Sequence, residues 1–282
     1  MECYEKGLLT EKQFDGLRPL WGDQRVILEL IRKIAYREGV GDILAEGVAR
    51  AADIMGEETK YYAIHIKGQD LYEPLRFAIG WALGACVSTR GGGHTTGSPT
   101  CETSLNLDEK LSKEIYGIDT FNQPLSYEGK EKLVRYHEML HRLNNSLGLC
   151  HFGNKDVTNP GFPEISELYN AATGKEVAVE DLQRASLRIL NLEKAFNILH
   201  AGFDRSDDYP PLRAMEEAII SRTAGGKEFK IEKEKYDVLL DKYYDMHGWD
   251  KKTGFPTRKC LENLGLQKVA DNLEYAGKLG NV

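Results

Sequence analysis

Apolar residues recur every three or four positions along most of this chain, and that spacing restricts the fold more than any other feature. In residues 24–37, for example, Val26, Leu30 and Ile34 fall on one side of a helix. Similar patterns predict helices over residues 42–55, with Asp42 as the cap, and over 127–145, 164–173, 179–200 and 233–246. The sequence therefore predicts an all-α, mostly helical fold, an irregular two-domain helical assembly with long loops.

A change of pattern indicates where the two parts meet. Residues 61–71 alternate between apolar and polar side chains, which predicts a short extended segment and a domain boundary. Residues 77–87 follow as an apolar stretch rich in small residues, including Gly80 and Gly84. Such a composition is typical of a helix that packs closely against a neighbouring backbone.

Charge and cysteine content exclude several classes of protein. The 282 residues include 37 basic and 44 acidic side chains, and a net charge of -7 argues against a nucleic acid or an anionic membrane as partner. No apolar run approaches the ~20 residues of a membrane span, and the first residues lack the features of a signal peptide. The five cysteines form no CxxC pair, so we expect a cytoplasmic protein without a disulfide framework.

The loop over residues 88–99 contains the most unusual local composition. Three consecutive glycines, beginning at Gly91, lie between Arg90 and His94. Glycine lets the backbone approach a ligand closely, while arginine and histidine supply a cation and a titratable group, so a phosphate-bearing ligand fits this loop. The spacing matches neither the P-loop nor the dinucleotide-binding fingerprint, and a flexible surface loop is the alternative.

Two further segments carry residues that are able to bind metals. Cys150 follows the end of a predicted helix, where it could be a metal ligand or a buried structural thiol. His137, Glu138 and His141 form an HExxH pattern on the same helix, the arrangement of a zinc peptidase. The extended form of that pattern is missing, and an exposed polar helix face is the favoured interpretation of these three residues.

Taken together, short strings along nearly the whole chain resemble the aldehyde:ferredoxin oxidoreductase family. They lie at residues 1–8, 34–39, 44–47, 67–68, 90–94, 145–150, 191–197, 202–205, 243–244, 248–250 and 264–266. The resemblance implies that residues 1–66 are the carboxy-terminal part of the family's second domain. Residues 67–282 would then be the third domain, carrying the His94 loop and the Cys150 turn.

The family binds tungsten or molybdenum through the dithiolenes of two pterins, beside a [4Fe-4S] cluster. By resemblance, Cys150 corresponds to a cluster ligand distant in sequence from the other three. Asn145, Gly148 and Leu149 resemble a pterin-binding turn, although the family usually has aspartate where Asn145 stands. An amide can bond to a pterin ring but supplies no negative charge.

The same resemblance assigns roles in the loop and predicts a reaction. His94 resembles the histidine that moves a proton during aldehyde oxidation, and Arg90 with Gly91 resembles a pterin contact. The implied activity is oxidation of aldehydes to carboxylic acids, with ferredoxin as electron acceptor. One thiolate cannot hold a four-cysteine cluster, so we expect the lone chain to be inactive without the family's amino-terminal region or a partner subunit.

Three alternatives to this function stay open from the sequence, as does a homodimer. A tungsten-dependent aromatic acyl-CoA reductase subunit would keep the architecture and change the reaction. A zinc peptidase would use His137, Glu138 and His141. A scaffold or electron-transfer subunit without catalytic activity is the third.

Overall fold

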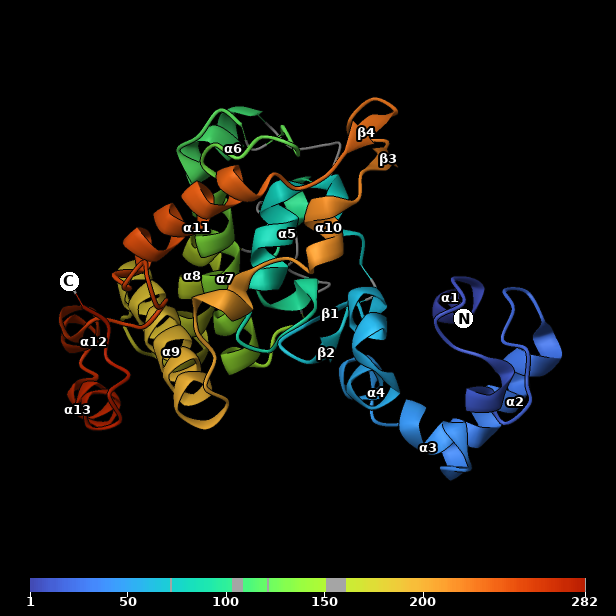
Figure 1. The fold of residues 1–282 in the computed structure, drawn as a ribbon. Coiled ribbons are helices and arrows are strands. Elements are labelled where there is room, and N and C mark those ends of the chain that lie inside the picture. The colour runs from blue at the N-terminus through green and yellow to red at the C-terminus, as the bar shows by residue number, and fades with distance from the viewer. Residues whose placement is uncertain (72, 103–108, 121, 151–160, 282) are drawn as a thin grey trace. The chain divides into compact units, whose positions relative to one another are not determined.

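The computed structural model describes residues 1–71, 73–102, 109–120, 122–150 and 161–281 (Figure 1). The chain divides into two compact units. Unit 1 comprises residues 1–72 and 211–213, and unit 2 comprises residues 73–210 and 214–282. The assignment of residues 1–66 and 67–282 to the family's second and third domains stays a prediction.

Both units are built mainly of helices, which confirms the predicted fold class. Within the described residues, sheet is confined to two antiparallel pairs of short strands. Strand β1 (His65–Ile66) pairs with β2 (Gln69–Asp70), and β3 (Ile219–Ser221) pairs with β4 (Lys227–Phe229). The predicted extended segment over residues 61–71 is therefore only the β1–β2 hairpin, since its first residues belong to a 3-10 helix, η2 (Glu57–Tyr62).

Unit 1 is a series of short helices around one longer one. Helix α2 (Gln24–Tyr36) begins where predicted, because the Asp23 carboxylate accepts hydrogen bonds from the amides of Arg25 and Val26 at 3.1 and 3.2 Å. Besides η2 and the β1–β2 hairpin, the described residues of the unit contain α1 (Glu2–Glu5), η1 (Glu11–Phe14), α3 (Val40–Leu44) and α4 (Val48–Met55).

The predicted helix over residues 42–55 is wrong in two respects. The segment forms two helices, α3 and α4, and Asp42 lies inside α3 instead of capping it. Gly47 separates the helices with a φ of +86°, a left-handed conformation that interrupts the helix and that glycine adopts without strain. Apolar periodicity continues across such a break and therefore does not reveal it.

The apolar face of α2 is incompletely covered. None of its residues is buried, and Leu28 and Ile31 are 59% and 57% exposed. A pocket of about 450 Å³ adjoins this helix and is lined mainly by apolar side chains, among them Leu30, Ile34 and Phe14. Unit 1 therefore presents apolar surface that a soluble domain would ordinarily bury.

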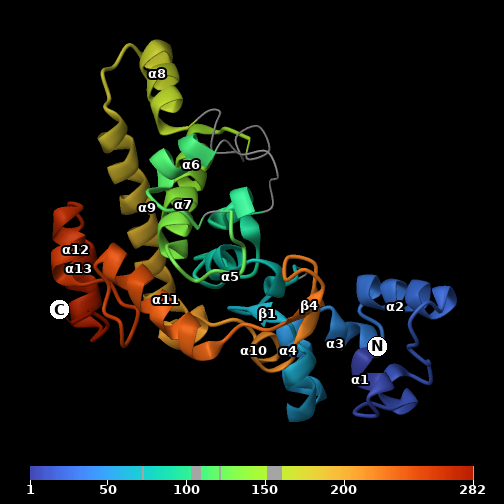
Figure 2. The same cartoon turned by 90° about the horizontal axis from the view of Figure 1, so that it is seen from above.

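Unit 2 is organised around α7 (Lys130–Leu147), which contacts three other long elements. These are α5 (Ile79–Cys86), α9 (Val179–His200) and α11 (Lys233–His247), and Figures 1 and 2 show them beside α7. The remaining helices in the part of the unit that the structure describes are η3 (Leu75–Phe77), η4 (His94–Thr96), η5 (Thr100–Glu102), α6 (Glu109–Tyr116), α8 (Phe162–Thr173), η7 (Arg205–Asp208), α12 (Arg258–Asn263) and α13 (Gln267–Tyr275). Helix α10 (Leu212–Glu216) begins within the residues assigned to unit 1 and ends in unit 2.

Helix α5 packs against the loop that follows it, as its small residues predict. A side chain at Gly84 would place its Cβ 2.6 Å from the Ser98 Cα and 2.8 Å from the Gly97 carbonyl carbon. Only glycine allows so close an approach of helix and loop. The 88–99 loop is thus packed against the unit, with Ser88, Gly91 and Gly97 buried, and the interpretation as a flexible surface loop is wrong.

A buried ion pair joins the start of α7 to the start of α5. Lys130 Nζ lies 2.6 Å from Glu102 Oε1, and both side chains are fully buried. The same carboxylate accepts hydrogen bonds from the amides of Gly80 and Trp81 in the first turn of α5. Helix α7 begins at Lys130 and not at the predicted residue 127, because Gly129 before it adopts a φ of +71°.

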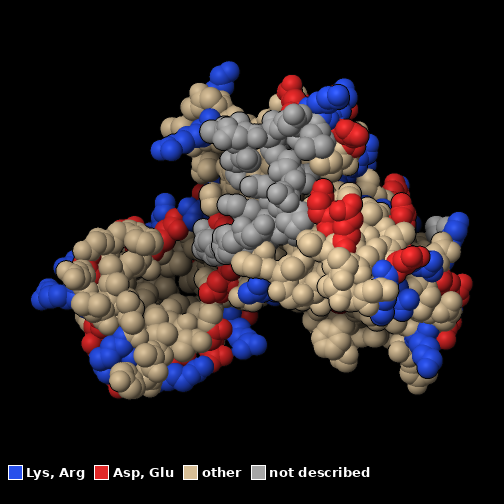
Figure 3. Space-filling view, turned by 180° about the vertical axis from the view of Figure 1, so that it is seen from behind, with Lys and Arg blue, Asp and Glu red and all other residues tan. Residues whose placement is uncertain are grey.

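Two observations concern hydropathy and surface charge. No helix in these residues is both long and apolar enough to cross a bilayer. On the face drawn in Figure 3, lysine and arginine side chains are interspersed with aspartate and glutamate. Both signs of charge are therefore present on this face.

We predict that Lys130→Met destabilises the protein by about 3 to 5 kcal/mol, because Glu102 would be left as an unpaired buried charge. Chemical denaturation followed by circular dichroism measures the effect. The double variant with Glu102→Gln should lose less than the sum of the two single changes. As a control, Asp119→Asn breaks the exposed pair with Lys113 and should cost no more than about 1 kcal/mol. Equal losses for the buried and exposed pairs would contradict this account.

Candidate functional site

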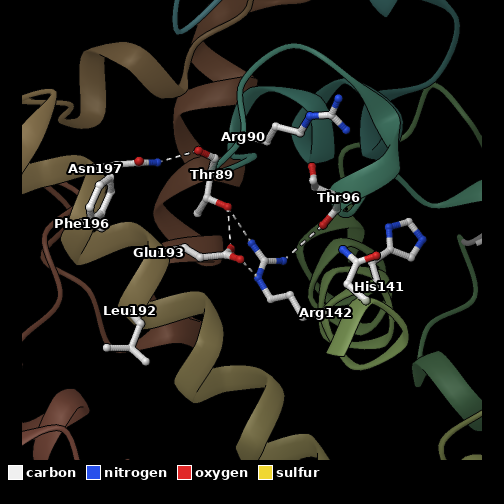
Figure 4. A pocket seen from close by; sticks show the side chains of 10 residues that line it. Thr89, Arg90, Thr96, His141, Arg142, Leu192, Glu193, Phe196 and Asn197 are labelled. Atoms are coloured by element: carbon white, nitrogen blue, oxygen red, sulfur yellow. Dashed lines mark hydrogen bonds and ion pairs between the residues drawn. The ribbon is translucent and has the colours of Figure 1, made fainter. Parts of the chain in front are cut away.

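A pocket of about 500 Å³ lies where the 88–99 loop meets α7 and α9. Its lining combines cationic, amide and hydroxyl side chains with a few apolar ones. The lining residues are Thr89, Arg90, Thr96, His141, Arg142, Asn145, Leu192, Glu193, Phe196 and Asn197 (Figure 4). The fold thereby brings Arg90 and Asn145, which are 55 positions apart in sequence, to one site.

The guanidinium of Arg142 is the structural centre of this pocket. It donates to Glu193 Oε2 at 3.0 Å, to Thr89 Oγ1 at 3.1 Å, and to the carbonyl oxygens of Thr96 and Glu138 at 3.2 and 3.1 Å. Figure 4 shows this side chain reaching from α7 toward α9 and the loop. Because its donors are used within the protein and its side chain is only 5% exposed, Arg142 holds the pocket together.

The loop is also fastened directly to α9. Thr89 Oγ1 donates to Glu193 Oε2 at 2.7 Å, and Asn197 Nδ2 donates to the Thr89 carbonyl oxygen at 2.5 Å. Both partners on α9 are one helical turn apart, so they face the loop together. These contacts fix the backbone immediately before Arg90.

Arg90 differs from Arg142 in exposure. It is exposed, and its guanidinium donates to Thr95 Oγ1 at 3.3 Å. Asn145 is likewise exposed, in the last turn of α7. A guanidinium and an amide at the mouth of one pocket are able to bind an anionic or polar ligand.

His94 lies two residues from the lining residue Thr96, and two other side chains hold it. Its Nδ1 contacts Glu73 Oε1, and its ring stacks on Trp81 at 4.9 Å between centroids, with 24° between the planes. Trp81 Nε1 donates to the other oxygen of Glu73 at 2.8 Å. Sequence analysis missed Glu73 and Trp81, because neither belongs to a recognisable motif.

The Cys150 turn follows α7 and remains outside the pocket lining. Gly148 ends the helix in a left-handed conformation, and the amide of Leu149 donates to the Asn144 carbonyl oxygen at 2.8 Å. Cys150 is exposed, so it is not the buried structural thiol that was one alternative. Among the residues described, no three histidine, cysteine or acidic side chains are grouped so as to hold a metal ion.

The HExxH residues are buried, so their interpretation as an exposed polar helix face is wrong. His137 exchanges a hydrogen bond with the Tyr116 hydroxyl at 2.8 Å, and Glu138 receives one from Tyr243 at 2.8 Å. His247 Nε2 lies 2.8 Å from Glu138 Oε1. The glutamate is thus engaged by α11, which does not favour a role as the base of a zinc peptidase.

Burial and these contacts shift the ionisation of the pair. Burial lowers the pKa of His247 below its usual 6.5, since the charged ring loses its hydration and Arg135 and Arg142 oppose a further cation. Burial also opposes ionisation of Glu138, but its contacts with His247, Arg142 and Tyr243 outweigh that effect and lower the pKa of the carboxyl. A neutral imidazole beside an ionised carboxylate fits both directions.

Nearly the whole chain matches one known protein family. Residues 1–266 match the family model described as aldehyde ferredoxin oxidoreductase, domains 2 and 3. The tungsten-containing aldehyde ferredoxin oxidoreductases of Pyrococcus furiosus and Thermococcus kodakarensis are each 32% identical to it. Each alignment covers 94% of this chain, which spans only 41% of the length of those relatives.

Two further similarities extend beyond the aldehyde enzymes. The WOR-like subunit of an aliphatic sulfonate oxidoreductase from Pyrococcus furiosus is 30% identical over the whole of this chain, which again spans 41% of it. A chain of the active-site complex BamBC of benzoyl coenzyme A reductase, solved with 1,5-dienoyl-CoA, matches with a TM-score of 0.75 and 26% identity. That match covers 100% of this chain and 44% of the other.

The buried pair predicts how stability depends on pH. Because the folded protein lowers the pKa of His247 below 6.5, the unfolded state binds more protons as the pH falls through that value, and the free energy of unfolding decreases. We expect the melting temperature to fall between about pH 7.5 and about pH 5.5. His247→Gln should reduce this slope, whereas His200→Gln, at an exposed site on α9, should retain it. If the melting temperature of His247→Gln depends on pH as steeply as that of the wild type, groups other than His247 cause the dependence.

Proposed function

This chain belongs to the aldehyde ferredoxin oxidoreductase family, and we propose that it is the part of a tungsten- or molybdenum-pterin oxidoreductase that comprises domains 2 and 3. The proposed reaction is oxidation of an aldehyde to a carboxylic acid, with ferredoxin as electron acceptor. The match of residues 1–266 to that part of the family carries the proposal. A cytoplasmic location agrees with the charge and the cysteine spacing.

The pocket residues have a chemistry that suits the cofactor. Arg90 supplies a planar fork of donors for phosphate or ring oxygens, and Asn145 supplies both a donor and an acceptor for a pterin edge. Gly91 lies in the same loop, and Gly148 and Leu149 form the turn after α7. We propose that these residues hold the pterin. When bound, the metal–pterin group would accept two electrons from the substrate.

In this mechanism His94 accepts a proton from the reacting group near neutral pH, the range in which an imidazole is effective. Arg142 and Glu193 do not take part in the chemistry. Their contacts with Thr89 and Thr96 keep the loop that carries His94 in one position on α7 and α9. A histidine on a fixed loop keeps its orientation between turnovers.

We propose that Cys150 ligates a [4Fe-4S] cluster whose other three thiolates come from outside this chain. The thiol is exposed, as a ligand shared with another polypeptide segment must be. A single thiolate is insufficient for such a cluster. Electron transfer to ferredoxin, and therefore activity, would require the family's amino-terminal region or a partner subunit.

The surface of unit 1 supports such a partner. The exposed Leu28 and Ile31 of α2, together with the apolar pocket beside that helix, form a surface that is costly to leave in water. The relatives contain more than half of their length beyond what this chain spans. We propose that this additional polypeptide covers α2.

A second candidate keeps the architecture and changes the substrate. The structural similarity to the BamBC complex covers all of this chain, and that complex was solved with a dienoyl-CoA. A reductase acting on an aromatic acyl-CoA thioester is therefore the alternative. Reduction of benzoyl-CoA, without oxidation of aldehydes, by the completed complex would favour it.

The first test is metal analysis of the chain purified without oxygen, both alone and co-expressed with the polypeptide encoded upstream. We expect iron, and tungsten or molybdenum, only in the co-expressed sample, because three cluster ligands are expected outside this chain. Cys150→Ser should lower the iron content of that sample, whereas Cys3→Ser, in unit 1, should not. Stoichiometric zinc in the lone chain, or aldehyde-dependent dye reduction by it, would contradict the proposal.

A second test addresses the contact with the partner. We predict that Leu28→Glu with Ile31→Glu weakens co-purification of the co-expressed partner at least about tenfold, because charges would replace apolar contact area. The control is Leu168→Glu, which changes an equally exposed leucine on α8 of unit 2. Circular dichroism of the lone chain should be the same for all three proteins. Equal loss of the partner in the control would show that α2 is not the contact surface.

A further inference from the structure

Two side chains from separate segments hold the ring of His94. Glu73 precedes η3, Trp81 lies in the first turn of α5, and His94 begins η4. The Glu73 carboxylate contacts both partners, His94 Nδ1 through Oε1 and Trp81 Nε1 through Oε2. The side chain of Glu73 is 6% exposed, whereas that of His94 is 21% exposed.

We infer that Glu73, with Trp81, is a positioning residue that fixes the tautomer and the orientation of the His94 imidazole. The inference rests on the proposed function, in which His94 accepts a proton. To that function it adds Glu73 as the residue that determines which nitrogen of the His94 ring accepts the proton. Glu73 acts through His94 and has no contact with the reacting atoms in this account.

The hydrogen-bonding capacity of each group determines the tautomer. An indole nitrogen only donates, so Glu73 Oε2 must be the acceptor from Trp81. A carboxylate carries no proton, so its other oxygen also accepts, from His94 Nδ1, which places the ring proton on that nitrogen. In a neutral imidazole the second nitrogen, Nε2, is then the acceptor. A proton from a substrate would therefore go to Nε2.

The surroundings of Trp81 make this arrangement rigid. Its backbone amide donates to the buried Glu102 at 2.7 Å, and its ring stacks on the imidazole. The ring of His94 therefore cannot rotate without separating from the indole and from Glu73. A histidine fixed in this way is pre-organised for one direction of proton transfer.

Glu73→Gln tests the inference because glutamine has one acceptor where glutamate has two. If the amide oxygen accepts from Trp81, the amide nitrogen must face His94 and donate to Nδ1, so the ring proton moves to Nε2. Nitrogen NMR of the full chain with labelled histidine, at about pH 8.5 so that the rings are neutral, distinguishes the tautomers. His94→Gln assigns its signals among the seven histidines.

We expect the wild type to show the Nδ1–H form of His94 and Glu73→Gln to show mainly the Nε2–H form. Adding Trp81→Phe to Glu73→Gln removes the competing donor, frees the glutamine oxygen for His94, and should restore the Nδ1–H form. Glu234→Gln, an exposed change on α11, should leave the signals unchanged. A merely structural loss would not be reversed by the second substitution.

An Nε2–H form in the wild type, or the same tautomer in all four proteins, would overturn the inference. The measurement needs no cofactor, so it is independent of the metal analysis that tests the proposed function. In an active co-expressed complex, Glu73→Gln should lower kcat by about 10²-fold with a smaller effect on KM, and the double variant should recover part of that loss.

Discussion

Unit 2 depends on the need to compensate charged side chains that α7 carries into the interior. Lys130, Glu138 and Arg142 follow one another along the helix and are all buried. Removing an ion from water costs several kcal/mol, so each requires a charged or polar partner at close range. The partners are Glu102, which ends η5 and accepts hydrogen bonds from the first turn of α5, His247 on α11, and Glu193 on α9. Three separate segments packed around α7 thus each supply one partner.

The same compensation determines what the pocket can bind. Arg142 pairs with Glu193 and donates its other hydrogen bonds to the loop and to the Glu138 carbonyl oxygen. Arg90 lies at the surface, and the partner described above for its guanidinium is the Thr95 hydroxyl. Arg90 and Arg142 therefore have different roles in the pocket, which the sequence does not distinguish. The inner arginine maintains the architecture, and the outer one is able to meet a ligand.

Local patterns predicted the helices and the ligand-facing loop, but not the interactions that place them. Periodicity located α2 and α9 almost to the residue, since each follows one helical period without a break. Periodicity did not reveal the break at Gly47, because a backbone conformation, and not a change in the apolar pattern, interrupts the predicted helix there. It also failed at Glu138, because His247 and Tyr243 lie more than 100 positions away and no sequence window joins them. For the same reason the sequence did not indicate Glu73 and Trp81 as neighbours of His94. Arg90 was indicated by the composition of its loop, whereas Asn145 was indicated only by the family resemblance.

The resemblance to the family implies an aspartate where Asn145 stands, and that difference would have an electrostatic consequence in this pocket. With Arg142 and Glu193 balancing each other, Arg90 contributes the remaining formal positive charge of the lining, apart from protonation of His141. An aspartate at position 145 would offset that charge, whereas asparagine leaves it in place. At a separation of several ångströms near the surface such a charge is worth on the order of 1 kcal/mol or more toward an anionic group. We therefore expect this pocket to suit a phosphate or carboxylate better than the same pocket with an aspartate at position 145. The difference would shrink at high ionic strength because both side chains are exposed.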